Sequence, residues 1–89
     1  MTFDFYSDPG HGWLKVSKSL LLKIIGAQWR SVFTPFSYER GDFVYLEEDC
    51  DLSRFINWME SVGLTVNIRQ RPQSNNRSRI RSYSILAPI

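Results

Sequence analysis

The sequence is poor in the residues that cross-link small domains, because its 89 residues include one cysteine and one histidine. A single cysteine excludes an internal disulfide, so we expect a protein of the reducing cytoplasm. No apolar run approaches the ~20 residues that cross a membrane, and no basic region followed by an apolar run begins the chain. We therefore expect no membrane partner and no signal peptide. A chain of this length predicts one domain, residues 1–89.

Acidic residues are absent from the C-terminal part of the chain. Residues 64–89 contain five arginines and no acid, whereas residues 1–63 contain six Lys/Arg and nine Asp/Glu. The formal charges of the two parts are therefore +5 and −3, which sum to +2. A basic segment of this kind is typical of contact with nucleic acid or with an acidic protein surface. A solvated face that balances the acidic part of the same molecule is the alternative.

The clearest structural pattern spans residues 36–63. Val44 and Leu46 share one side of an alternating segment and Phe43 and Tyr45 share the other, which predicts a strand inside a sheet. A turn at Arg40-Gly41 precedes this strand. The helix that follows is expected to begin with Asp51 as its N-cap and to end at Gly63. Its apolar stripe is predicted to consist of Leu52, Phe55, Trp58 or Met59, and Val62.

The rest of the chain repeats this plan more loosely. Residues 2–6 and 14–16 predict strands, and residues 20–25 predict a helix that is capped by Ser17 or Ser19 and stops at Gly26. Residues 64–71 and 78–86 predict two more strands around a polar loop at 72–76. The order is β-β-α-β-β-α-β-β. Short connections of this kind favour an α+β fold, with a mostly antiparallel sheet and both helices on one face.

Arginines gather in the last predicted hairpin. Arg69 and Arg71 share one side of their strand, and Arg79, Arg81 and Tyr83 share one side of the next strand, with Arg77 continuing the row. If the two strands pair, one face carries four arginines and a tyrosine. Arginine binds phosphates through two hydrogen bonds and tyrosine stacks on bases. We therefore expect these six residues to bind nucleic acid or a nucleoprotein complex.

Two other groups of residues offer alternatives. The acidic corner of Glu47, Glu48, Asp49 and Asp51 lacks the spacing of a calcium-binding loop, and we expect these acids to stabilise the helix start instead of binding a metal. His11 lies between two glycines and precedes Trp13, in a loop that could face a ligand.

One histidine and no nucleophile–base pair argue against an enzyme and against a cofactor. A small metal-dependent nuclease or phosphodiesterase that uses the acidic corner with His11 remains an alternative. A protein that holds a nucleotide between residues 10–13 and the arginines is another.

Two motifs carry a resemblance to a known family. The segments SDPGHGW at residues 7–13 and YLEEDCDL at residues 45–52 resemble a family of small proteins encoded by bacteriophages, prophages and plasmids. The resemblance implies an accessory role in the cytoplasm of a bacterial host and supplies no catalytic residues. By analogy with other small phage proteins, it suggests an inhibitor of host defence of the anti-CRISPR type. The oligomeric state and the partner stay open.

Overall fold

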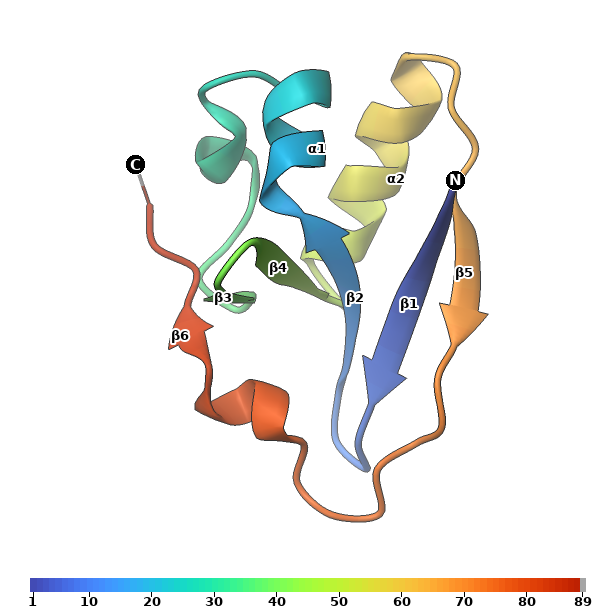
Figure 1. The fold of residues 1–89 in the computed structure, drawn as a ribbon, viewed down its shortest axis with the longest axis vertical. Helices are drawn as coiled ribbons and strands as arrows, with labels where there is room; N and C mark the ends of the chain where they lie inside the picture. The colour runs from blue at the N-terminus through green and yellow to red at the C-terminus, as the bar shows by residue number, and fades with distance from the viewer. Residues whose placement is uncertain (89) are drawn as a thin grey trace.

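The computed structural model describes residues 1–88, which form one layer of sheet and one layer of helices (Figure 1). The elements in chain order are β1 (Thr2–Ser7), β2 (Gly12–Ser17), α1 (Lys18–Ile24), the 3-10 helix η1 (Trp29–Val32), β3 (Tyr38–Arg40), β4 (Phe43–Glu47), α2 (Asp51–Ser61), β5 (Asn67–Gln70), the 3-10 helix η2 (Arg79–Ser82) and β6 (Ser84–Ile85). The six strands are arranged in the order β5-β1-β2-β4-β3-β6. The pair β1–β5 is parallel, and the other four pairs are antiparallel. The predicted α+β fold is confirmed.

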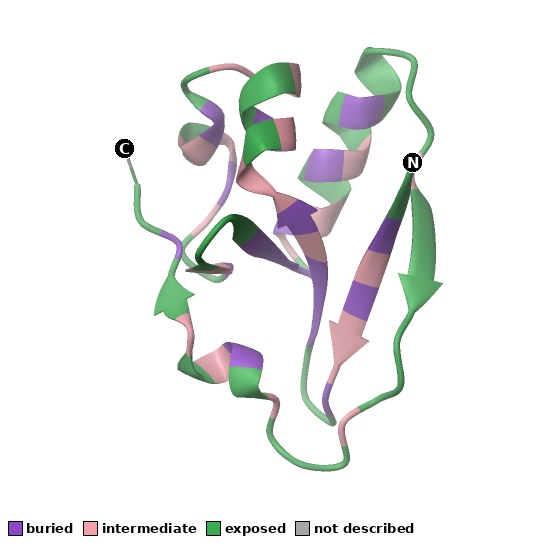
Figure 2. Ribbon diagram, viewed as in Figure 1, coloured by how far each residue is buried: buried purple, intermediate pink, exposed green. Residues whose placement is uncertain are grey.

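The main core lies between one face of the sheet and the two helices. Alternate residues of β1, β2 and β4 meet Leu21 of α1 and the α2 residues Phe55 and Met59, which are all buried (Figure 2). The ring of Phe55 packs edge-on against Phe3 at 5.2 Å. Of the two residues predicted as alternatives in the stripe, Met59 is buried and Trp58 is 37% exposed, because Met59 occupies the sheet-facing position in that turn. The predicted stripe is wrong at Val62, which is 50% exposed at the end of the helix.

The start of α2 differs from the prediction that Asp51 caps it. Asp51 is the first residue of the helix, and its buried carboxylate accepts hydrogen bonds from the amide and hydroxyl of Thr34 and from the hydroxyl of Ser37. Glu47 instead accepts hydrogen bonds from the amides of Asp49 and Cys50. Asp51 therefore joins α2 to the segment before β3, and Glu47 satisfies the amides at the corner.

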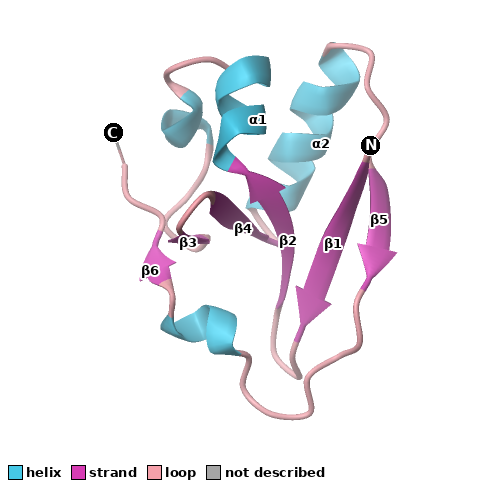
Figure 3. Cartoon of the chain, viewed as in Figure 1, coloured by secondary structure: helices cyan, strands magenta, loops and turns pink. Residues whose placement is uncertain are grey.

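The C-terminal part of the chain does not form the predicted hairpin. β5 pairs with β1 at one edge of the sheet, whereas β6 pairs with β3 at the other edge (Figure 3). Residues 71–83 pass around the end of the β1–β2 hairpin to connect the two edges, and η2 replaces the first half of the predicted strand 78–86. The amides of Arg71 and Ser74 donate to carbonyls of Phe5 and Ser7, so the chain follows β1 instead of turning back on itself.

Two glycines adopt the left-handed conformation that their positions require. Gly41 has φ of 57° in the β3–β4 turn, and Gly63 has φ of 79° after the end of α2. Both predicted breaks in the chain are confirmed, because a side chain at either position would be strained. Among residues 1–88, no helix is both long and apolar enough to cross a bilayer.

Candidate functional site

The sheet face opposite α1 and α2, here called the open face, carries aromatic and basic side chains. Side chains alternate along a strand, so residues between the core positions of β1, β2, β3 and β4 point to this face. The pairing of Tyr6 with Trp13 and of Lys15 with Tyr45 places them side by side. The residues of the open face in these strands include Tyr6, Trp13, Lys15, Tyr38, Arg40, Phe43 and Tyr45.

A second hydrophobic cluster covers part of the open face. Trp13 and Tyr45 pack there with Ile80 from η2, and Tyr83 packs against this cluster. The rings of Tyr45 and Tyr83 are 5.0 Å apart and tilted by 55°. Trp13 and Tyr38 lie at 6.3 Å in an edge-on arrangement. The cluster therefore holds the segment that follows β5 against the sheet.

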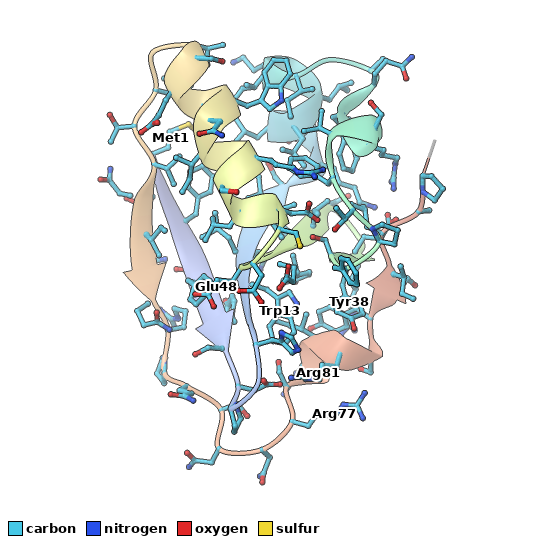
Figure 4. The ribbon with its side chains drawn as sticks, turned by 180° about the vertical axis from the view of Figure 1, so that it is seen from behind. Met1, Trp13, Tyr38, Glu48, Arg77 and Arg81 are labelled. Carbon is cyan, nitrogen blue, oxygen red and sulfur yellow. The ribbon has the colours of Figure 1, made fainter. Side chains whose placement is uncertain are left out.

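Asp8 in the β1–β2 turn anchors η2 to this face. Its buried carboxylate accepts two hydrogen bonds from Arg81, at 2.6 and 2.9 Å, and further bonds from the amides of Gly10, His11 and Ser78. These bonds hold the pKa of Asp8 far below its usual range, and the bond from Arg81 has the largest effect. The guanidinium of Arg81 also lies 5.4 Å from the Trp13 ring, and the two residues are close to Tyr38 in Figure 4.

A groove of about 470 Å³ lies between the open face and η2, and we call it the tyrosine groove. Its lining includes Tyr6, Lys15, Tyr45, Arg79, Ile80 and Tyr83. Burial raises the pKa of Tyr45 most, and the neighbouring Tyr83 raises it further. The Tyr45 hydroxyl therefore stays protonated at neutral pH. Lys15 lies 4.1 Å from the ring of Phe43, and Arg40 lies 5.0 Å from that of Tyr83. Aromatic rings and cations therefore lie together in and beside the groove.

The structure separates the arginines that the sequence places on one face. Arg69 is at the β5 edge, where its guanidinium pairs with Asp4 at 2.6 Å. Arg71 follows β5 and is exposed, Arg77 projects from the loop, and Arg79 lines the tyrosine groove (Figure 4). The predicted face of four arginines is wrong, because β5 and β6 are not neighbours. Arg79 and Tyr83 still lie together.

The open face contains four residues that were not predicted as site residues from the sequence: Tyr6, Lys15, Arg40 and Tyr45. A signal for them is present in the sequence. In β4, Phe43 and Tyr45 alternate with the core residues, so an aromatic second face is readable from the strand pattern alone.

A second cavity on the open face contains the predicted ligand loop. It measures about 390 Å³, and its lining includes His11, Trp13, Phe36, Tyr38, Glu47 and Arg81. Phe36 is 67% exposed at its rim, whereas Trp13 is 1% exposed. His11 and Trp13, which the sequence places in one possible ligand loop, line this cavity together.

Comparisons of the chain with models of protein families, with characterised proteins and with solved structures find no match. The fold and the site therefore define the protein by its physical class alone. It is a small α+β domain with helices on one face of the sheet and an aromatic, cationic groove on the other.

Proposed function

We propose that the protein binds single-stranded nucleic acid in the tyrosine groove. The observation that supports this function is that Tyr6, Tyr45 and Tyr83 line one groove together with Lys15 and Arg79. Single strands bind where bases stack on aromatic rings and phosphates meet nearby cations. Sheets with exposed aromatic residues are one architecture that recognises RNA in this manner.

The charges around the groove favour a polyanion. Lys15 and Arg79 line the groove, and Arg40 stacks on Tyr83 beside it. The nearest acid of β1, Asp4, is already paired with Arg69. A strand of phosphates therefore meets more positive than negative charge along this side of the sheet.

The proposal includes a cellular role in which the protein acts on a nucleoprotein complex of a bacterial host. The resemblance of the segments at residues 7–13 and 45–52 to proteins of mobile elements supports this role, and it suggests an inhibitor of host defence of the anti-CRISPR type. Residues 71–83 bring exposed Arg71, Arg77 and Arg79 to the surface, where they are available to such a complex.

Fluorescence anisotropy with labelled 12-nucleotide dT and rU strands tests the binding function. We expect Arg79→Glu to lower affinity at least tenfold and to reduce the slope of log K against log salt by about 1, because one phosphate contact is lost. Tyr83→Ala should also weaken binding, since stacking on one ring contributes ~1–3 kcal/mol. Lys23→Glu, an exposed charge reversal on α1, is the matched control and should leave the affinity unchanged apart from a small general charge effect.

Two results would contradict the proposal. One is the absence of binding to either strand at 50 mM salt. The other is equal affinity for the wild-type protein and the Arg79→Glu variant when circular dichroism shows both to be folded. Arg81→Glu is unsuitable for this experiment, because Arg81 holds Asp8 and its reversal would disturb η2. A protein partner would instead show a shallow salt dependence, mainly in the association rate.

A further inference from the structure

One histidine and two carboxylates from separate segments meet at the edge of the second cavity. His11 comes from the turn after β1, Glu47 ends β4, and Asp49 lies in the corner before α2. One ligand atom from each of the three residues lies within 4.8 Å of the other two. His11 Nδ1 lies 4.0 Å from Glu47 Oε1.

Glu47 is one of three buried carboxylates among residues 1–88, with Asp8 and Asp51. Asp8 is paired with Arg81, and Asp51 receives hydroxyl and amide hydrogen bonds. Glu47 is 6% exposed and accepts hydrogen bonds from the amides of Asp49 and Cys50. Among residues 1–88 its one ion-pair partner is His11, which is charged only when protonated. The two amide hydrogen bonds stabilise this carboxylate, but no lysine or arginine among the described residues neutralises its charge, so a cation bound here would be stabilised by it.

Trp13 is an independent sign that a ligand belongs here. Its indole Nε1 is buried and has no hydrogen-bond partner among the described residues. The residue is 1% exposed and lines the same cavity as His11 and Glu47. Buried donors are almost always paired, so an unpaired one calls for an acceptor from outside the described residues. A water or an anionic oxygen bound to a cation is such an acceptor.

We propose that His11, Glu47 and Asp49 bind one divalent cation of the borderline class, such as Mn²⁺ or Zn²⁺. An imidazole nitrogen with two carboxylate oxygens suits these ions better than Ca²⁺ or Mg²⁺, which favour oxygen alone. Ligand atoms ~2.0–2.2 Å from one ion lie roughly 3–4 Å apart. The exposed side chains of His11 and Asp49 can make the small closing movement toward buried Glu47. The remaining coordination positions open to the cavity and hold water.

Isothermal titration of EDTA-treated protein without a histidine tag, in the absence of nucleic acid, tests the site. We expect one equivalent of Zn²⁺ or Mn²⁺ to bind, with Mg²⁺ and Ca²⁺ at least tenfold weaker. His11→Ala and Asp49→Asn should each weaken binding at least tenfold. Glu48→Gln is the matched control, because it removes an adjacent exposed acid outside the group and should leave the affinity unchanged.

Co²⁺ spectroscopy and a melting experiment separate loss of metal binding from loss of folding. Co²⁺ bound at the site should show visible absorption bands that the His11→Ala variant loses while its melting temperature without metal is unchanged. The proposal is overturned if no ion binds below 1 mM or if His11→Ala binds Zn²⁺ as tightly as the wild type. It is equally overturned if Glu48→Gln weakens binding as much as Asp49→Asn. Because no nucleic acid is present, these outcomes are separate from the test of the tyrosine groove.

Discussion

Asp8 is expected to control whether the C-terminal segment stays on the sheet. Its carboxylate is buried and joins the β1–β2 turn to Ser78 and Arg81, which are about seventy positions further along the chain. Asp8→Ala removes all of these bonds and also those to the amides of Gly10 and His11. Breaking a buried ion pair by removing one partner costs ~3–5 kcal/mol. We take about 3 kcal/mol, the lower end of that range, because the Arg81 side chain is 23% exposed and regains hydration when Asp8 is removed.

For a domain of this size, a loss of 3 kcal/mol corresponds to a fall in Tm of roughly 12–24 °C. The fall should be accompanied by increased fluorescence quenching by acrylamide, because η2 covers Trp13. Hydrogen exchange should increase in residues 71–83 before it increases in α2. The amides of the core on the helix-covered face, including that of Phe55, should stay protected from exchange until global unfolding.

Asp4→Ala is the matched control for this experiment. Asp4 also pairs with an arginine of the C-terminal segment, but the Arg69 side chain in that pair is 61% exposed. Exposed pairs contribute little, so this variant should lose much less stability than Asp8→Ala. Equal Tm values for the two variants, or unchanged quenching in Asp8→Ala, would refute the idea that the Asp8 carboxylate holds η2 in place.

Three further predictions concern the core and its carboxylates. Phe55→Ala should cost ~3–5 kcal/mol in urea unfolding, whereas Trp58→Ala should cost less than about 1 kcal/mol because its side chain is half outside the core; equal losses would show that the helix is turned differently. Asp51→Ala should cost more than the ~1 kcal/mol typical of a lost N-cap, because it leaves Thr34 and the buried hydroxyl of Ser37 without their acceptor; a loss below 1 kcal/mol would contradict this. Arg30 above all lowers the pKa of Glu39 to about 2, so the contribution of Glu39 to stability is present above the usual value of 4.5 and is lost as the pH falls toward 2; Glu39→Gln should flatten the acid limb of a plot of Tm against pH, and an unchanged limb would exclude this role.

The strands and the two α-helices up to Gly63 could be predicted because local signals agree with tertiary packing there, whereas the 3-10 helix η1 was not predicted. Alternation in β4, the serine before α1 and the glycine after α2 each have a local physical cause. Trp58 could not be placed, because Trp58 and Met59 both fit an apolar helix stripe and only the position of the sheet decides between them.

The path of residues 64–88 could not be predicted, because it depends on contacts that are distant in the sequence. Nothing local shows that Asn67–Gln70 pairs in parallel with β1 or that Arg81 reaches Asp8. The alternating arginines are compatible with an antiparallel hairpin and equally with a chain that crosses between two edges. The buried carboxylate of Asp8 is one of the contacts that hold this path, and its partners cannot be recognised from spacing alone.

This arrangement explains part of the charge difference between residues 1–63 and residues 64–89. Of the five arginines after residue 63, Arg69 and Arg81 are paired with acids of the first eight residues, Asp4 and Asp8. These two pairs attach the basic segment to the β1–β2 hairpin, so part of the charge serves the fold. Another acid, Glu39, is compensated by Lys18 and Arg30. The cations that remain available at the tyrosine groove, Lys15 and Arg79, therefore face solvent beside aromatic rings. Some cations are thus paired within the fold, and others remain free to meet a ligand. For this reason we expect the groove, and not the whole basic segment, to contact a phosphate backbone.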